Sequence, residues 1–441
     1  MTEKPIVNIF WFRRDLRLHD NAGLYYALRS EHPVLPLFIF DKNILDKIPE
    51  KDDARVTFIS HTLLELDKSL KDLNSSLLVK YATPKDAFVE LLNHYMIKEV
   101  YTNTDYEPYA KTRDLEIAAL LKARGVILRS YKDHLIFEKD EVVKDDGKPY
   151  TVYTAYKRKW LEKLRPDSHL TPYITLTHSN NFFKGIFNNP YSLADLGFSE
   201  SKILIPDKVY KPVLATYAET RDFPAINGTS RIGIHLRFGT ISIREIASDA
   251  LDSPVWLSEL IWRDFYSMIL WNFPETAYRS FKKEYDNIKW RNNEDEFIAW
   301  CQGRTGYPIV DAGMRQLNET GWMHNRVRMI VASFLCKHLL IDWRWGEAYF
   351  AQKLIDYDMA SNVGGWQWAA GTGNDAAPYF RIFNPDLQTK KFDSKMEYIK
   401  RWIPEYSDPF TYPAPIVDHK YARERALSAY SVAVKGNAPT P

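Results

Sequence analysis

Residues 5–12 read PIVNIFWF, a short apolar run near the start of a chain of 441 residues. Runs of this length that are rich in β-branched and aromatic residues are typical of buried β-strands. Similar runs follow, and we expect strands in all of them, at 34–40 (VLPLFIF), 76–82 (SLLVKYA), 99–105 (EVYTNTD) and 127–132 (ILRSYK).

The segments between these runs have helical patterns. In 52–74, apolar residues recur every three or four positions, which predicts a helix, at Val56, Ile59, Leu63, Leu66 and Leu70. Segments 84–96 and 109–124 follow the same pattern, and Gly125 fits a helix stop. Strands that alternate with helices predict a doubly wound parallel sheet, and we place this α/β domain at 1–132.

The strand pattern does not continue through the rest of the chain. Residues 133–205 are polar and turn-rich, so we expect an inter-domain connection with some helix of its own. The sequence predicts a helical domain at 206–441, with helices at 242–251, 255–272, 293–302, 311–319, 324–340 and 345–356. The tail SAYSVAVKGNAPTP (428–441) is expected to fray.

Composition narrows the classes of function. The net charge is +2, so any contact with nucleic acid must come from a local patch rather than from total charge. Aromatic residues make up 14% of the chain, which favours binding by stacking. The two cysteines form no disulfide framework, the N-terminus lacks a signal-peptide pattern, and no apolar stretch reaches about 20 residues. These features predict a cytoplasmic protein without a membrane span.

The loop after the first run reads WFRRDLRLHDN (11–21), where a dinucleotide-binding fold would carry G-x-G-x-x-G. A Rossmann-type dinucleotide site is therefore disfavoured. Arg13, Arg14 and Arg17 either form a solvated loop or pair with carboxylates across a domain interface. We favour such a structural role over ligand binding.

The stretch GTSRIGIHLRFGTIS (228–242) combines hydroxyl side chains with Arg231 and Arg237. Near the start of a helix, hydroxyls, backbone N–H groups and a guanidinium can cradle a phosphate. The alternative is an ordinary helix N-cap made by Thr229 or Ser230.

In ELIWRDFY (259–266), Glu259, Trp262 and Tyr266 share one face of a helix. A carboxylate beside an indole can grip a planar ligand that has a hydrogen-bonding edge. The alternative is an amphipathic helix that buries Trp262 in the core.

The segment DYDMASNVGGWQW (356–368) combines acidic residues, paired glycines and two tryptophans. Asp356 and Asp358 can be caps, metal ligands or ribose binders, but no cluster of further carboxylates or histidines supports a metal. Glycine lets another molecule or a neighbouring helix approach the backbone closely. On a helix, Trp366 and Trp368 would point to nearly opposite sides, one inward and one towards a cleft. Either a planar ligand or core packing would explain them.

These motifs resemble, in order, those of the photolyase/cryptochrome family. The resemblance rests on WFRRDLRLHDN, YAETRDFPAINGTS (217–230), ELIWRDFY, GRTGYPIVDAGMRQLNETGWMHNRVRMIVASFL (303–335) and LIDYDMASNVGGWQWAAGTGNDAAPYFRIFNP (354–385). It covers nearly the whole chain and is closest to the bacterial class I cyclobutane pyrimidine dimer photolyases. It implies an N-terminal α/β antenna-type domain and a C-terminal helical FAD-binding catalytic domain.

The resemblance also implies a reaction: light-dependent repair of pyrimidine dimers in damaged DNA by a monomeric lyase. Photoexcited, reduced FAD would pass an electron to a flipped-out dimer, the cyclobutane ring would split, and the electron would return. The dimer would lie against Glu259, Trp262, Asn325, Met329 and Trp368. Contacts to DNA would come from Arg326, Arg381, Trp262 and Trp368.

Further residues follow from the family's motifs. FAD would contact Tyr217, Thr229, Ser230, Arg231, Ile232, Gly233, Glu259, Arg263, Tyr266, Asn325, Arg328, Asp356, Asp358 and Asn362. Gly233 departs from the pattern, because many members have serine there. A chain of tryptophans would carry electrons from the surface to the flavin, and its members would be Trp366, Trp343 and Trp290.

Three other functions compete with this reading. A (6-4) photolyase needs paired active-site histidines, and Asn325 and Met329 occupy those positions near His324. A cryptochrome, a light sensor without repair, often has a long C-terminal extension and a changed residue facing flavin N5. This chain ends soon after the helical domain and keeps Asn362. An unrelated helical DNA-binding protein would not explain the ordered motifs.

The identity of a second, antenna chromophore is open between deazaflavin, a flavin and folate, and it can also be missing. Folate-type relatives carry an Asn-Glu pair where this chain has Tyr109 and Ala110, so folate is disfavoured. Arg55 and Glu107 lie in segments where an antenna could sit.

Overall fold

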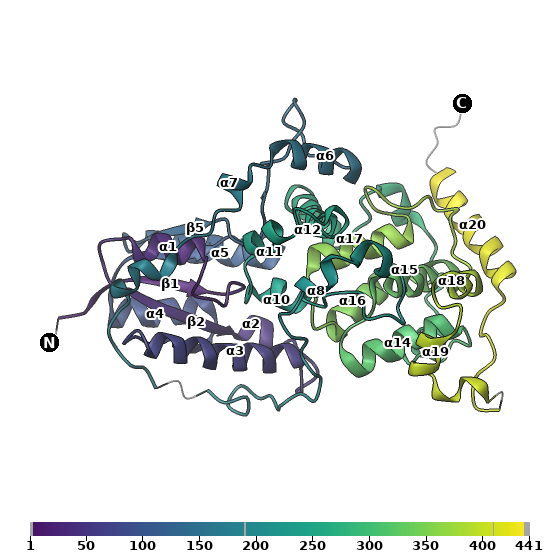
Figure 1. Ribbon diagram of the computed structural model, residues 1–441, viewed down its shortest axis with the longest axis horizontal. Coiled ribbons are helices and arrows are strands. Elements are labelled where there is room, and N and C mark those ends of the chain that lie inside the picture. The colour runs from purple at the N-terminus through teal and green to yellow at the C-terminus, as the bar shows by residue number, and fades with distance from the viewer. Residues whose placement is uncertain (1–2, 189–190, 409, 436–441) are drawn as a thin grey trace. The chain divides into compact units, whose positions relative to one another are not determined.

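The computed structural model describes residues 3–188, 191–408 and 410–435. The chain divides into two compact units (Figure 1). The N-terminal unit comprises residues 1–138, 164–208 and 232–252, and the helical unit comprises residues 139–163, 209–231 and 253–441. Among the described residues, no helix has both the length and the apolar character that a membrane span requires.

A five-stranded parallel sheet forms the centre of the N-terminal unit. Its strands are β1 (Ile6–Phe12), β2 (Val34–Asp41), β3 (Leu78–Ala82), β4 (Met96–Asn103) and β5 (Ile127–Tyr131), in the order β3-β2-β1-β4-β5. β1 pairs with both β2 and β4, so the chain builds outward from β1 in both directions. The predicted doubly wound α/β architecture is confirmed, and the loops after β1 and β4 lie at the same edge of the sheet.

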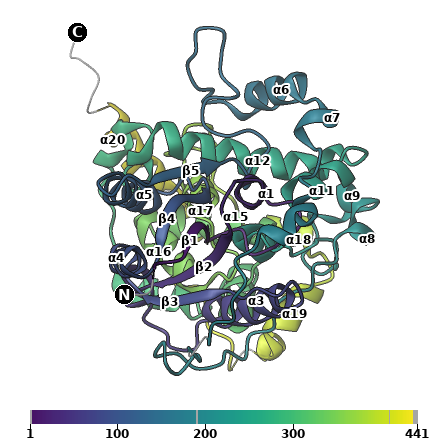
Figure 2. The ribbon, with the colours of Figure 1, turned by 90° about the vertical axis from the view of Figure 1, so that its left-hand side faces the viewer.

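Helices cover both faces of this sheet (Figure 2). α4 (Pro84–His94) and α5 (Pro108–Lys122) lie on one face, and α1 (Ala22–Leu28) and α3 (Ala54–Lys71) lie on the other. Alternate residues of β1 point to the first face and pack against α4 and α5 in one apolar core, which contains Val7, Ile9, Trp11, Phe88 and Leu121. The unit also contains α2 (Lys42–Leu45), α7 (Pro166–His169), the 3-10 helix η1 (Thr175–Asn181), α10 (Gly233–Phe238) and α11 (Ile243–Asp249).

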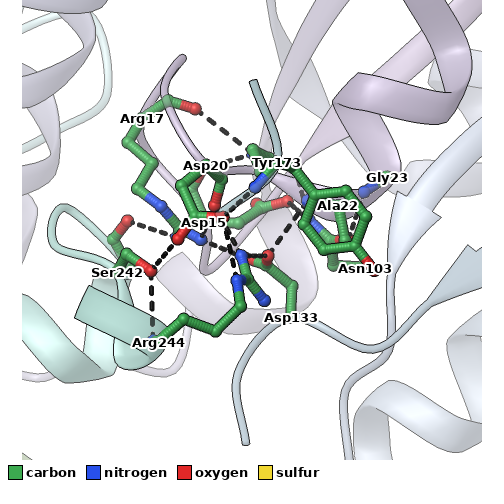
Figure 3. Close-up of polar contacts among 12 residues, drawn as sticks. Asp15, Arg17, Asp20, Ala22, Gly23, Asn103, Asp133, Tyr173, Ser242 and Arg244 are labelled. Carbon is green, nitrogen blue, oxygen red and sulfur yellow. Dashed lines mark hydrogen bonds and ion pairs between the residues drawn. The ribbon is translucent and has the colours of Figure 1, made fainter. Parts of the chain in front are cut away.

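The loop after β1 is buried in a polar cluster of the same unit (Figure 3), made of Asp15, Arg17, Asp20, Asn103, Asp133, Ser242 and Arg244. Asp133 accepts hydrogen bonds from Nη2 of Arg17 and Nη2 of Arg244, both at 2.7 Å, and from the Ala22 N–H at 3.0 Å. Arg244 Nε also donates to Asp20 at 2.8 Å. Arg17 therefore has the structural role that we favoured, with its partners inside one unit rather than across an interface.

The other two arginines of that loop are paired as well. Arg13 Nη1 donates to Asp114 at 2.5 Å, and Arg14 Nη1 donates to Asp105 at 2.9 Å and Glu107 at 3.2 Å. All of these carboxylates follow β4 in the chain. A solvated loop is therefore wrong, because each guanidinium finds a carboxylate at the same edge of the sheet.

The helical unit is built from helices of very different length. They are α6 (Tyr153–Lys163), α8 (Lys211–Leu214), α9 (Tyr217–Thr220), α12 (Pro254–Asn272), η2 (Pro274–Ala277), η3 (Lys283–Asn287), α13 (Glu294–Cys301), α14 (Pro308–Thr320), α15 (Asn325–Ser333), the π-helical turn η4 (Phe334–His338), α16 (Trp343–Lys353), α17 (Met359–Ala370), α18 (Pro385–Phe392), α19 (Glu397–Trp402), η5 (Pro404–Ser407) and α20 (His419–Lys435). Residues 232–252, which the sequence placed in the helical domain at 206–441, belong to the N-terminal unit, and residues 139–163, which it placed in the connection, belong to the helical unit.

Helix α17 packs against α12, α15 and α16. Gly346 of α16 makes this close packing possible, because a Cβ there would lie 2.1 Å from Cη2 of Trp366. α17 ends at Gly371, whose φ of 87° is the left-handed conformation that favours glycine at a helix end. The GGWQW motif is thereby held in a helix with neighbours on several sides.

The expected fraying of the tail is wrong for residues 428–435, which belong to α20. Tyr430 is fully buried, stacks on Tyr379 with ring centroids 5.9 Å apart, and donates its hydroxyl to the Ala370 carbonyl at 2.8 Å. Residues 436–441 lie outside the described part of the chain.

Candidate active site

A cavity of about 420 Å³ opens in the helical unit. Small-ligand sites commonly have volumes of about 300–1,000 Å³. Helices α12, α15 and α17 and the segment between α16 and α17 supply most of its lining. Of the residues singled out from the sequence, the lining contains Glu259, Trp262, Arg263, Tyr266, Asn325, Arg326, Arg328, Met329, Asp356, Asp358, Asn362, Trp366 and Trp368.

Helix α12 contributes Glu259, Trp262 and Tyr266 to the lining, because residues three and four apart share a helix face. Glu259 accepts a hydrogen bond from Arg221 Nη1 at 2.5 Å. Burial raises the pKa of the Glu259 carboxyl, and the Arg221 guanidinium opposes that shift. This wall therefore combines an indole with a carboxyl group that is easier to protonate than an exposed one.

Helix α15 positions two arginines of the lining. His324 is its N-cap, since Nδ1 accepts a hydrogen bond from the Arg326 N–H at 3.1 Å. Arg328 Nη2 donates to both carboxylate oxygens of Asp356, at 2.9 and 3.1 Å. A guanidinium held in this way presents a fixed positive charge to the cavity.

Helix α17 begins at the acidic segment. Asp358 is its N-cap and accepts from the Ser361 N–H at 3.1 Å, so one of the roles considered for this residue is filled. Asn362, one turn on, donates from Nδ2 to Oε1 of Glu347 at 2.9 Å. Burial raises the pKa of Glu347, and the bond from Asn362 opposes the shift. The bond fixes the orientation of the amide in the cavity wall.

The paired glycines of α17 have different surroundings. A Cβ on Gly364 would lie 2.2 Å from Cδ1 of Tyr266, so this glycine allows a neighbouring helix to approach. A Cβ on Gly365 would have nothing within 4 Å, and Gly365 lines the cavity. The wall there is bare backbone, so a flat ring system can approach it closely. The residues present therefore fit a planar, polar-edged cofactor such as a flavin.

Comparison with known proteins identifies the family to which this chain belongs. A family profile described as the FAD binding domain of DNA photolyase matches residues 256–432, and a second, described as DNA photolyase, matches residues 8–174. The deoxyribodipyrimidine photo-lyase of Synechococcus sp. is 38% identical, with 96% of this chain and 96% of that protein covered. The chain belongs to the DNA photolyase family.

Solved structures of photolyases agree with this membership. A bacterial class III photolyase from Agrobacterium tumefaciens has a TM-score of 0.87 and 35% identity, covering 99% of this chain and 98% of that chain. An archaeal photolyase from Sulfolobus tokodaii, which has two FAD molecules, has a TM-score of 0.82 and 36% identity, covering 96% and 99%. The predicted membership, fold class and FAD-binding domain are confirmed.

In this member of the photolyase family, the tryptophans proposed for electron transfer lie in the helical unit. Trp366 lines the cavity and is buried against Phe350, at 5.0 Å between ring centroids. Trp343 is buried in the same apolar core, and Trp290 is half-buried at its edge. Trp368 is half-buried and also lines the cavity, so both tryptophans of the motif reach the cavity, and only Trp366 is part of the buried core.

Other residues predicted from the sequence motifs lie outside the cavity lining. Tyr217 is buried in α9, Thr229 and Ser230 are half-buried, and Arg231 is exposed over the ring of Trp322. Arg381 is also exposed, with its guanidinium 6.0 Å from the Phe383 ring.

Ile232 and Gly233 belong to the N-terminal unit, at the start of α10. The alternative that Thr229 or Ser230 caps a helix is wrong, because the N-cap of α10 is Ile232 and no side chain caps it. The GTSR stretch thus precedes the helix as irregular backbone with a bend at Thr229.

Sequence reasoning missed several residues of the site. Arg221 and Glu347 lie against predicted residues, yet each reaches its partner from a distant part of the chain, since 38 residues separate Arg221 from Glu259 and 15 separate Glu347 from Asn362. Neither motif contains a local signal for such a contact. Gly365 was the exception, because paired glycines beside tryptophans did point to a close approach.

Proposed function

We propose that the protein is a deoxyribodipyrimidine photo-lyase that splits cyclobutane pyrimidine dimers in DNA under light. The observation that supports this most is the composition of one cavity wall. Polar residues suited to a flavin, namely Arg328, Asp356 and Asn362, share the lining with an acidic and aromatic set suited to a dimer, namely Glu259, Trp262 and Trp368.

Reduced FAD, when bound, would supply an electron in blue light and take it back after the ring has split. On the protein side, the Arg328–Asp356 pair, the Asp358 carboxylate and the Asn362 amide would hold the polar edge of the ring system. Gly365 would let its flat face approach α17. Tyr217, Thr229, Ser230 and Arg231 would hold the ribose and phosphates, with Ile232 and Gly233 following in the chain.

The dimer would be held by Glu259, Trp262 and Trp368, with Asn325 and Met329 beside it. A protonated carboxyl can donate a hydrogen bond to a thymine carbonyl, and the raised pKa of Glu259 favours that form. Stacking on indoles compensates for the lost stacking of a flipped-out base, and a lesion that is already poorly paired loses least. Selectivity for a dimer over undamaged DNA would follow.

Two arginines would position the DNA backbone without reading its sequence. Arg326 lines the cavity and donates to Asp222 at 2.7 Å, and Arg381 is exposed. On binding DNA, Arg326 would leave Asp222 and Arg381 would leave the Phe383 ring, and both guanidinium groups would donate to phosphate oxygens. We also infer that the protein acts in the cytoplasm, which its two free cysteines support, and that it acts as a monomer, as the resemblance to the family implies.

Trp366, Trp343 and Trp290 would carry an electron to oxidised flavin and so activate the cofactor. Replacing the middle residue, as Trp343→Phe, is expected to abolish light-driven flavin reduction in the presence of a thiol. Repair with chemically reduced flavin should be retained. If Trp343→Phe photoreduces as the wild type does, this path is not the one in use.

An antenna, if bound, would sit at the carboxyl edge of the sheet. Tyr109, at one of the two folate positions, donates its hydroxyl to Asp41, and Glu107, in a segment where an antenna could sit, accepts from Arg14 and Arg237, so both side chains are engaged within the unit. This supports a deazaflavin or flavin over folate. A chromophore extracted from the purified protein and identified by mass would decide.

The decisive experiment follows thymine dimers in UV-damaged oligo-thymidine mixed with the reduced holoprotein. Dimers should disappear only in the light, and Glu259→Ala should lower the yield about two- to tenfold, because a hydrogen bond between neutral groups contributes about 0.5–1.5 kcal/mol. The exposed Glu275→Gln serves as a matched control that should repair normally. Flavin photochemistry without any loss of dimers would contradict repair and favour a light sensor.

A further inference from the structure

Trp262 is covered on one side by a residue that no motif pointed to. The ring of Tyr153 lies parallel to the indole, with ring centroids 3.5 Å apart and an interplanar angle of 7°. Phe265 and Tyr266 meet the same indole edge-on or tilted, at 5.6 and 5.2 Å. Since Trp262 also lines the cavity, a ligand that stacks on it must use the face opposite Tyr153.

The geometry of this pair indicates that it is held in place. Aromatic rings prefer offset or edge-to-face contacts over a nearly centred parallel stack. Tyr153 is anchored at both ends: its hydroxyl donates to the Ser258 carbonyl at 2.8 Å, and its N–H donates to Asp375 at 2.9 Å. The accepting carbonyl belongs to the peptide that joins Ser258 to Glu259. Tyr153 therefore contacts Trp262 directly and fixes the backbone immediately before Glu259.

The helix that carries Tyr153 is fastened to α12 along its length. Lys157 Nζ donates to the Ser258 hydroxyl at 2.6 Å, and Trp160 Nε1 donates to the buried Asp264 at 2.9 Å. Thr151, just before α6, accepts from Asn374 at 2.9 Å. These bonds make α6 and α12 one rigid support, with the Tyr153 ring at its cavity end.

We propose that Tyr153 is a positioning residue that holds Trp262 for stacking on the flipped-out pyrimidine dimer. The proposal rests on the function proposed above, because it takes Trp262 to be a surface for the dimer. Without the Tyr153 ring, the Trp262 side chain would occupy more than one rotamer in the free protein. Binding of the dimer would then have to fix a single rotamer, and this loss of side-chain entropy would weaken the binding. Undamaged DNA, which does not enter the cavity, would bind as before.

The competing explanation is that Tyr153 merely packs α6 onto α12. Tyr156 allows the two to be separated, because it lies on the same helix, is fully buried, and packs against Phe265 at 5.2 Å. Loss of either ring removes packing between the helices, but only the Tyr153 ring stacks on Trp262. A purely structural role would make the two variants alike.

The test measures dissociation constants of the FAD-loaded protein for a thymine-dimer oligonucleotide and for its undamaged counterpart. Tyr153→Leu should weaken binding of the dimer about three- to tenfold and leave undamaged DNA and FAD content unchanged. Tyr153→Phe keeps the ring and should stay within about twofold of the wild type. Tyr156→Leu should lower the unfolding temperature without changing the preference for the dimer.

Two outcomes would overturn the proposal in distinguishable ways. If Trp262→Leu keeps the preference for the dimer, the function assigned to Trp262 is wrong and the role of Tyr153 falls with it. If Trp262→Leu loses the preference but Tyr153→Leu keeps it, or if Tyr156→Leu loses it equally, only the positioning role is wrong. Where Tyr153→Leu does not retain FAD, Tyr153→Met, which also lacks a ring, replaces it, and a preference equal to that of the wild type again overturns the proposal.

Discussion

The polar cluster beside β1 and the cavity of the helical unit are made from the same kinds of side chain but differ in how fully these are enclosed. In the cluster, the side chains of Arg17, Asp133 and Arg244 are 4%, 1% and 7% exposed. In the cavity, Arg221 and Glu259 are 22% and 33% exposed although they are paired. The cluster fills its own space, whereas the cavity leaves about 420 Å³ beside its charges.

This difference in exposure distinguishes a structural polar network from a ligand-binding site. A buried carboxylate that already accepts three hydrogen bonds, as Asp133 does, has little capacity left for a ligand. The paired groups of the cavity can exchange a partner, because water and ligands reach them. Charge and residue type alone, which are what a sequence provides, do not distinguish the two cases.

The largest effect on stability is expected from removing the charge of Asp133 in the buried polar cluster. Asp133→Asn leaves two buried guanidinium groups without their shared anion, and breaking such a pair typically costs about 3–5 kcal/mol of unfolding free energy. The matched control is Glu116→Gln, which removes an exposed pair with Lys85 and should cost less than about 1 kcal/mol. Denaturant unfolding measures both. Equal losses would mean that the cluster is no tighter than a surface ion pair.

The same variant has a pH signature. Although burial opposes it, Arg17 and Arg244 hold the pKa of Asp133 well below its usual range. The stabilisation is therefore present above the unfolded pKa of about 4 and is lost as the pH falls below it. Burial instead raises the pKa of Asp15 to about 6, which acts in the opposite sense between about pH 4 and 6. Because the Asp133 charge also helps to raise the pKa of Asp15, the wild type minus Asp133→Asn difference contains a change at Asp15 as well, and only its part below about pH 4 reports on Asp133.

Much of the fold and part of the site were predictable. The strands of the sheet have local apolar runs, and Glu259, Trp262 and Tyr266 share a helix face by spacing alone. The partners of these residues could not be predicted, because contacts such as Arg17 with Asp133 and Tyr153 with Trp262 join residues about a hundred positions apart. The sequence suggested that a glycine allows close approach by either a neighbouring helix or another molecule. Only the structure shows that Gly364 faces a neighbouring helix and Gly365 faces the cavity.

Lys337 is an exception to this contrast, because its amino group is buried and no carboxylate within the described part of the chain is bonded to it. Its Nζ donates to the Tyr379 carbonyl at 3.2 Å and lies 3.7 Å from the centroid of the Tyr430 ring. Burial lowers its pKa to about 7. The unfolded state then holds the extra proton between about pH 7 and 10.4, so this residue makes stability rise with pH across that window.

Lys337→Met should remove that rise and raise the unfolding free energy at pH 6 by about 2 kcal/mol, because burying the ammonium costs more than its attraction to the Tyr430 ring contributes. Thermal unfolding at pH 6 and pH 9 measures both. A variant that is less stable at both values would mean that the ring and the carbonyl satisfy the charge as well as a carboxylate would.

Gly364 and Gly365 are adjacent in α17, yet one lies in enclosed packing and the other at the open cavity. Gly364→Ala places a Cβ against the Tyr266 ring and should lower the unfolding free energy by about 1–3 kcal/mol. Gly365→Ala, its matched control, meets open space and should be neutral or more stable by up to about 1 kcal/mol, because alanine favours a helix. Only Gly365→Ala should weaken FAD binding at unchanged stability. Equal destabilisation by both would show that the cavity wall at Gly365 is closed.

The smallest effect is expected at Arg381, an exposed arginine that we place on a DNA phosphate. Arg381→Ala should weaken binding of damaged and undamaged DNA alike and reduce the slope of log K against log salt by about 0.9, because one fewer counterion is released. Lys85→Ala, an exposed cation of the N-terminal unit, should leave that slope unchanged. A loss confined to damaged DNA would instead place Arg381 with the residues that recognise the dimer. An unchanged slope would remove it from the DNA-binding surface, because an exposed cation that contacts a phosphate must release a counterion when the DNA binds.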